Sequence, residues 1–125
     1  MAKETTDSLW LGTDLTRAYH IKDEAETTSI NISGWTLGWM LKRFTSDADA
    51  DAILTKTTTG GAVVIAGTFN TTPASNSQRA TLTLEDSDTA ALYPGLYHWE
   101  LKRTDDGYET VLAYGQMTMI QGVHR

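Results

Sequence analysis

The sequence predicts an all-β fold, a sandwich of two antiparallel sheets without a disulfide, on three observations. Short segments of alternating apolar and polar residues recur along the chain, which is the pattern of half-buried strands. Turn-forming residues separate these segments about every 8 to 12 positions, a spacing typical of sandwiches. Threonine is abundant, and it favours pleated surfaces over helix interiors. We therefore expect about 7–9 strands.

The strongest predicted strand lies within residues 93–107. This segment begins with a Pro-Gly turn signal and ends with Asp-Gly, which is a strong hairpin signal. Between the two turns, Tyr97, Trp99 and Leu101 alternate with polar residues. Two large aromatic side chains on one face give this strand a large apolar area to bury. We expect it to be the central strand of its sheet.

Further strands are expected on both sides of this segment. A second strong strand over residues 35–44 carries large apolar side chains on one face, namely Trp35, Leu37, Trp39 and Leu41. Weaker patterns predict strands over residues 16–22, 29–33, 53–58, 62–69, 79–84 and 108–120. The last of these is apolar on both faces over residues 111–114, which indicates an interior position in a sheet or contact with a neighbour. Residues 85–92 are expected to form one helical turn capped by Asp86 or Ser87.

Chain length and composition restrict the domain organisation. The 125 residues are most simply one domain, expected over residues 9–120. Residues 1–8 are expected to form a flexible N-terminal arm, and residues 121–125 a C-terminal tail. No apolar run approaches the roughly 18 residues of a membrane span, so we expect no membrane partner. The absence of cysteine excludes disulfides, thiolate metal sites and cysteine nucleophiles.

The charge of the chain bears on its partners. The formal net charge is −6 at pH 7, and the sequence has no basic cluster. An acidic surface repels phosphate backbones, so direct binding of nucleic acid is not expected.

The densest acidic cluster consists of Asp47, Asp49 and Asp51. Calcium prefers several carboxylate oxygens, which makes these residues candidate metal ligands. An EF-hand loop starting at Asp47 would require glycine at its sixth position and glutamate at its twelfth, but these positions hold Ala52 and Thr58. We interpret the cluster as a solvated loop and retain the three aspartates as weak metal candidates.

Catalytic signatures are missing from the sequence. The three histidines have no metal-ligand spacing, and no serine lies in a nucleophile-elbow motif. We therefore expect no enzymatic activity, no catalytic residue and no cofactor.

Nine tryptophan and tyrosine residues could form a core or a contact surface. The alternation predicts that Trp35, Trp39, Tyr97 and Trp99 lie in the core. Aromatic residues outside the core are candidates for partner contact, because Tyr and Trp are enriched in interfaces. The candidates of this kind are Trp10, Tyr93, Tyr108 and Tyr114. A sugar-stacking platform is the alternative interpretation of these aromatics.

One local feature favours an immunoglobulin-like topology. Residues 86–97 contain an acidic corner followed by a tyrosine early in a strand, which resembles the tyrosine corner of immunoglobulin domains. Trp99 stands where the second disulfide cysteine of an antibody domain would lie. A sandwich formed by this chain must therefore rely on apolar packing alone.

Two segments resemble a known family. Gly34-Trp-Thr-Leu-Gly-Trp-Met-Leu-Lys and the stretch from Asp86 to Gly107, with Tyr114-Gly115 in the last strand, are similar to small immunoglobulin-like domains of tailed-phage virion proteins. These include the N-terminal domain of baseplate upper proteins. The resemblance implies a structural protein of the virion that docks on other virion subunits and forms a homo-oligomer in the assembled particle.

The resemblance leaves the position in the virion open. Baseplate upper proteins continue into a long segment that carries receptor-binding partners, whereas this sequence stops after the domain. We therefore expect an accessory of the tail, baseplate or neck, or a capsid decoration protein. The alternative from another class is a carbohydrate-binding β-sandwich module.

Overall fold

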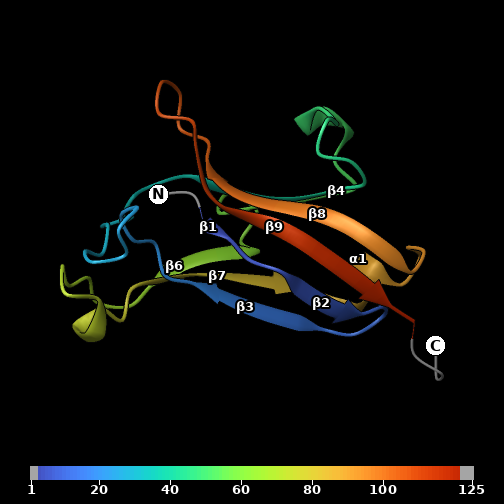
Figure 1. The fold of residues 1–125 in the computed structure, drawn as a ribbon, viewed down its shortest axis with the longest axis horizontal. Helices are drawn as coiled ribbons and strands as arrows, with labels where there is room; N and C mark the ends of the chain where they lie inside the picture. The colour runs from blue at the N-terminus through green and yellow to red at the C-terminus, as the bar shows by residue number, and fades with distance from the viewer. Residues whose placement is uncertain (1–2, 122–125) are drawn as a thin grey trace.

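The computed structural model describes residues 3–121, which form two β-sheets packed face to face (Figure 1). Sheet A contains, in spatial order, β1 (Lys3–Glu4) and β2 (Asp7–Trp10), then β9 (Thr110–Ile120), β8 (Gly95–Arg103), β4 (Leu37–Lys42) and β5 (Leu54–Thr57). Sheet B contains β3 (Leu15–Tyr19), β7 (Arg79–Leu84) and β6 (Val63–Ala66). Three short helical turns complete the fold: η1 (Asp49–Asp51), η2 (Pro73–Ser75) and α1 (Asp86–Thr89). Within this range, no helix is long and apolar enough to cross a membrane.

The strand order confirms the predicted immunoglobulin-like sandwich. In immunoglobulin lettering, β3, β7 and β6 correspond to strands B, E and D, and β9, β8, β4 and β5 to strands G, F, C and C′. The tyrosine corner is also present, because the Tyr97 hydroxyl donates a 2.8 Å hydrogen bond to the backbone carbonyl of Tyr93. As expected, β8 is central in its sheet, between β9 and β4.

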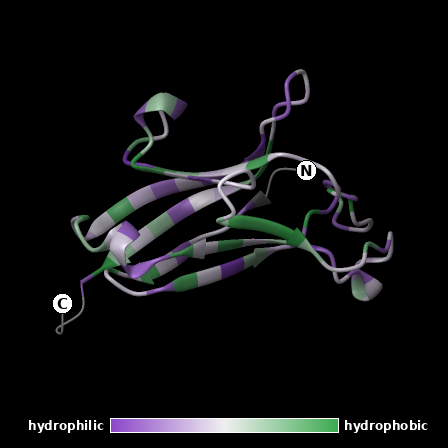
Figure 2. Cartoon of the chain, turned by 180° about the vertical axis from the view of Figure 1, so that it is seen from behind, coloured by the Kyte–Doolittle hydropathy of each residue, from purple (hydrophilic) through white to green (hydrophobic). Residues whose placement is uncertain are grey.

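The core between the sheets consists of the inward residues of both layers (Figure 2). Trp39, Tyr97 and Trp99 are buried as predicted. Trp35 is not in a strand; it precedes β4, is partly buried, and lies beneath the guanidinium of Arg103 at 4.1 Å from the ring centroid. The expected alternation also fails in β4, where all six residues are buried. At the end of this strand, ion pairs with Asp49 and Glu100 hold the Lys42 side chain against the sheet.

A β-bulge explains why β9 is apolar on both faces. Leu101 pairs with Ala113 but Lys102 pairs with Val111, so Leu112 is an extra residue in β9. Both Leu112 and Ala113 are therefore directed inward and buried. The predicted interior position of β9 is confirmed, because β8 flanks it on one side and β1 and β2 on the other.

The N-terminal residues differ from the expected flexible arm. Residues 3–8 are tied to the sheet, because β1 and β2 both pair in parallel with β9. Buried Leu9 and Leu11 anchor this segment in the core. The sandwich is therefore antiparallel except at this edge. Residues 122–125 of the expected tail lie outside the described residues.

Smaller differences concern segments held by side chains. The strand expected over residues 16–22 ends at Tyr19, and residues 29–33 contribute only an isolated bridge between Lys22 and Ser29. In place of a pairing strand, the Gln78 side chain bonds this segment, because its carbonyl oxygen accepts a hydrogen bond from the Ile32 amide at 3.1 Å. The helical turn after β7 is capped by Glu85 in a capping box with Asp88, not by Asp86 or Ser87.

Candidate docking surface

Two loops project from the side of sheet A that faces away from sheet B. The loop after β4, which contains η1, and the β8–β9 hairpin loop rise at opposite ends of this face (Figure 1). Between them lies a cavity of about 540 Å³ on the outer face of the sheet. Residues from four strands and the loop after β4 line it: Glu4, Lys42, Thr45, His98, Glu100, Tyr114 and Gln116. This arrangement forms a shallow surface framed by loops, which we call the outer face of sheet A.

Lys42 organises the charges on this face. Its ammonium group lies 2.7 Å from Asp49 Oδ1 and 3.3 Å from Glu100 Oε1. Burial alone would lower the pKa of Lys42, but hydrogen bonds to these two carboxylates raise it above its usual value. Lys102 donates a second hydrogen bond to Asp49. Hydrogen bonds from Lys102 and Lys42 lower the pKa of Asp49 to about 2.

These contacts bear on whether Asp47, Asp49 and Asp51 can act as metal ligands. Asp49 is occupied by two lysines, and Asp47 accepts a hydrogen bond from the backbone amide of Phe44 at 3.1 Å. Asp51 is exposed on the same turn. Within residues 3–121, no group of three or more His, Asp or Glu side chains is placed to hold a metal ion. The structure therefore does not bring the three aspartates together as ligands.

All four predicted contact aromatics are exposed. The exposed fractions are 54% for Trp10, 81% for Tyr93, 63% for Tyr108 and 41% for Tyr114. Tyr114 points outward near the middle of sheet A, opposite Glu100, and Trp10 lies at the end of β2 beside Ile120. Tyr93 precedes β8, whereas Tyr108 lies in the hairpin loop at the other end, with the Arg103 guanidinium 4.7 Å from its ring centroid. The four residues thus lie on separate elements and do not form a single compact cluster.

Two further apolar residues of this face were not singled out from the sequence. Leu96 points outward from β8 and Phe44 follows the end of β4, with exposed fractions of 46% and 61%. Lys42, the last residue of β4, pairs with His98 of β8. Phe44 and Leu96 each lie two residues beyond this pair, at the same end of the sheet. Phe44 was expected to be the last residue of a strand, so it was not considered as a surface residue. A single leucine such as Leu96 can lie either in the core or on the surface, and the sequence does not distinguish the two.

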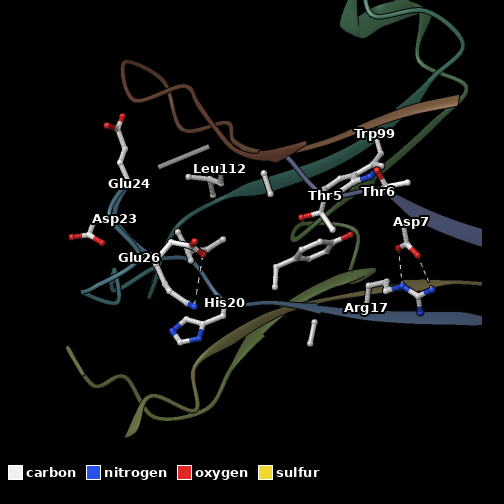
Figure 3. A pocket seen from close by; sticks show the side chains of 15 residues that line it. Thr5, Thr6, Asp7, Arg17, His20, Asp23, Glu24, Glu26, Trp99 and Leu112 are labelled. Carbon is white, nitrogen blue, oxygen red and sulfur yellow. Dashed lines mark hydrogen bonds and ion pairs between the residues drawn. The ribbon is translucent and has the colours of Figure 1, made fainter. Parts of the chain in front are cut away.

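A second cavity, of about 460 Å³, lies between β2 of sheet A and β3 of sheet B. Figure 3 shows Asp7 and Arg17 joined across one end, and His20, Glu24 and Glu26 near the other. The Arg17 guanidinium contacts both Asp7 carboxylate oxygens, at 2.8 and 3.0 Å. This ion pair connects the two sheets along the open side of the sandwich.

Burial and hydrogen bonds shift the pKa values of two groups around this second cavity. Burial opposes ionisation of Asp7, but the hydrogen bonds from Arg17 and from the Ser8 amide lower its pKa below the usual value. Burial raises the pKa of Tyr19 to about 12, so its hydroxyl stays protonated at neutral pH. The Tyr19 hydroxyl and the indole N–H groups of Trp39 and Trp99 are buried without a hydrogen bond of normal length and angle. The Trp39 indole is nonetheless close enough to the Tyr19 hydroxyl to lower its pKa slightly against the effect of burial. Tyr19 and Trp99 both belong to the lining of the cavity.

Comparisons with known proteins add little to this geometry. No protein-family model and no curated protein matches the chain. Among solved structures, the chain is similar to the NK cell receptor Nkp44, described as a triggering partner in natural cytotoxicity. The identity is 14% and the TM-score 0.42, with 95% of this chain and 100% of that chain covered. At this TM-score the similarity carries no argument, and the immunoglobulin-like assignment rests on the strand order and the tyrosine corner.

Proposed function

We propose that the chain is a non-enzymatic structural protein that docks on other protein subunits through the outer face of sheet A. One observation carries this proposal: the exposed aromatic residues are unevenly distributed. Trp10 and Tyr114 lie on the outer face of sheet A, on the paired strands β2 and β9, and Leu96 lies on the next strand, β8. The outward residues of sheet B are mostly small, namely Thr16, Ala18, Val64, Ala66 and Thr83. Exposed aromatic residues concentrated on one face are typical of interaction surfaces.

The setting we propose is the virion of a tailed phage. The motif resemblance in residues 34–42 and 86–107 supports this setting, as an accessory of the tail, baseplate or neck or as a capsid decoration protein. Docking by many copies related by symmetry would add weak contacts into a stable attachment. Large apolar side chains framed by charged residues suit such a surface, because the apolar centre excludes water and the charges set the orientation.

The test is incorporation of variants into assembled particles. Trp10→Ala and Tyr114→Ala remove exposed side chains, so both variants should fold normally and show reduced incorporation. Thr83→Ala, on the outward surface of sheet B, is the matched control and should be incorporated normally. Normal incorporation of both aromatic variants would contradict the proposed docking face. Failure to find the chain in any purified particle would contradict the virion setting.

The cavity on the same face favours one second candidate, a carbohydrate-binding module. Its volume is in the range of small-ligand sites, and it combines Tyr114 with polar side chains such as His98 and Gln116. An aromatic ring beside hydrogen-bonding groups can stack on a sugar ring and fix its orientation. A glycan array separates the two candidates, because glycan binding that is lost in Tyr114→Ala supports the module, whereas an array without a hit contradicts it.

A further inference from the structure

Strand β6 is an exposed edge without a single charge. It lies at the end of the order β3–β7–β6, so in the described part of the chain no strand pairs with its outer side. Its sequence is Val-Val-Ile-Ala, and residues 57–78 around it contain no Asp, Glu, Lys, Arg or His. Figure 2 shows β6 coloured hydrophobic along its whole length, whereas neighbouring strands alternate. An unpaired, uncharged and apolar edge is a template for pairing with another strand.

The other sheet edges of the described residues all carry charge. β1 contains Glu4, β2 contains Asp7, β3 contains Arg17, and β5 contains Lys56. Charged residues on an edge strand oppose pairing with a second chain, because the charge would be buried or repelled. The absence of such protection at β6 therefore distinguishes this edge from the others.

The backbone of β6 is ready to pair on its outer side. The Thr83 amide donates to the Ala62 carbonyl at 2.9 Å, which makes Ala62 and Thr83 a hydrogen-bonded pair. Because hydrogen-bonded and non-hydrogen-bonded pairs alternate in an antiparallel ladder, Val64 and Ala66 also bond to β7. The N–H and C=O groups of Val63 and Ile65 consequently point away from β7, toward the free edge.

We propose that β6 pairs antiparallel with β6 of a second copy of this chain, so that the two B sheets join across a two-fold axis. A register centred on Val64 lets Val63 and Ile65 of one copy exchange both hydrogen bonds with Ile65 and Val63 of the other. Val64, 51% exposed, then faces its own counterpart as an apolar cross-strand pair. This inference does not depend on the proposed function, which uses the opposite sheet.

Charge favours this edge over the other surfaces for contact between two copies. With a net charge of −6, two copies repel each other over most surfaces, and contact is least opposed where neither copy carries charge. A second copy presents a strand of the same length, the same apolar character and the complementary pattern of donors and acceptors. The contact is short, so we expect a weak dimer.

The test is sedimentation of the whole chain from about 10 µM to about 1 mM, the range of weak associations. The wild-type chain should dimerise with concentration. Val64→Lys and Val64→Glu should each be monomeric, because like charges meet across the axis, and an equimolar mixture of the two should recover the dimer. Leu96→Lys adds the same charge at a similarly exposed apolar site on sheet A and should dimerise like the wild type.

Three results would overturn the proposal: a wild-type monomer throughout this range, a Val64→Lys dimer as strong as the wild type, or a charge-swapped mixture that stays monomeric. Amide hydrogen exchange tests the contact without any substitution. The amides of Val63 and Ile65 should gain protection as the wild-type concentration rises, while the amide of Thr5, at the opposite edge of the sandwich, should not. Equal exchange of Val63 and Ile65 at low and high concentration would also overturn it.

Discussion

Tyr19 and Trp99 stack across the two sheets, with ring centroids 5.4 Å apart and planes tilted by 37°. Trp99 follows the corner residue Tyr97 by two positions, which is the place of the second disulfide cysteine in an antibody domain. Tyr19 contacts it from β3, the strand that carries the first cysteine in such domains. An aromatic pair thus joins the sheets where a disulfide does so elsewhere, as expected for a chain without cysteine.

Truncation of this pair should be among the most damaging changes in the core. Trp99→Ala removes a large side chain that is 4% exposed, and we expect a loss of about 3–5 kcal/mol in the free energy of unfolding. Tyr19→Phe should leave stability unchanged or raise it, because the buried hydroxyl has no hydrogen bond of normal length and angle. Urea unfolding of both variants checks these values, and a Tyr19→Phe loss above about 1 kcal/mol would show that the hydroxyl is bonded.

Gly115 should be indispensable for the N-terminal edge. A Cβ atom at this position would lie 1.8 Å from the Thr5 carbonyl oxygen, where the chain passes from β1 to β2. We expect Gly115→Ala to cost about 1–3 kcal/mol and to release β1 from β9. Hydrogen exchange at the Thr5 amide, which donates to the Tyr114 carbonyl at 2.8 Å, reports this release directly.

The control for this variant is Gly38→Ala. A Cβ atom at Gly38 meets the Thr104 methyl group at 3.4 Å, a contact that a small shift relieves. Its effect should be clearly smaller than that of Gly115→Ala. Similar losses for the two variants would show that the close approach of Thr5 does not determine the stability of this edge.

Structural features that depend on neighbouring residues in the chain were predictable from the sequence. Features that depend on contacts between distant segments were not. The turn signals and the Tyr97–Trp99 alternation predict β8 and the tyrosine corner, because both depend on neighbours in the chain. Pairing of Lys3 and Glu4 with β9 has no local signal, since it depends on the space that Gly115 leaves.

The candidate surface shows the same limit. Trp10, Tyr93, Tyr108 and Tyr114 were candidates for partner contact because the alternation did not assign them to the core, and all four are exposed. Asp49 could be recognised only as part of an acidic cluster, since its partner Lys102 lies 53 positions away. Such pairings follow from the fold, and no spacing in the sequence encodes them.

Added calcium should leave the unfolding temperature unchanged. Asp49 is already bonded to Lys42 and Lys102, so a calcium ion would have to displace two ammonium groups to use it. A ligand that binds only the folded state raises the free energy of unfolding by RT ln(1 + L/Kd), where L is the free ligand concentration, so it also raises the unfolding temperature. Thermal unfolding with calcium and with a chelator checks the prediction, and a rise of several degrees with calcium would contradict it.

Asp49 should contribute to stability in the acid range. Its pKa in the folded chain is about 2, below the usual aspartate value of 3.8. The unfolded state therefore binds more protons between these values, and the contribution of Asp49 is present above pH 4 or so and is lost as the pH falls toward about 2. Asp49→Asn should flatten the pH dependence of unfolding in this window, whereas Asp51→Asn, on the same exposed turn, should leave it in place.

His20 should make stability depend on pH near neutrality. Burial and the nearby charges of Arg79 and Lys22 lower its pKa below 6.5. The Asn76 carbonyl oxygen accepts the amides of Asn70 and Gln78, so the Asn76 amide nitrogen, 3.0 Å from His20 Nε2, donates to that ring nitrogen. Toward Asn76, Nε2 is therefore an acceptor, which requires that this nitrogen carry no proton. Ser29 Oγ lies 2.8 Å from the same nitrogen.

Protonation of Nε2 ends its role as acceptor for Asn76, and the sign of the pH effect follows from the lowered pKa of His20. Between the lowered pKa of folded His20 and about 6.5, the unfolded chain binds more protons, so stability rises with pH and is complete above that window. Denaturant unfolding from pH 5 to 8 or so should show this rise in the wild type. His20→Ala should lose it, while His98→Ala, on the outer face of sheet A, should keep it. An unchanged pH profile in His20→Ala would show that the polar contacts between Asn76 and His20 do not couple folding to protonation.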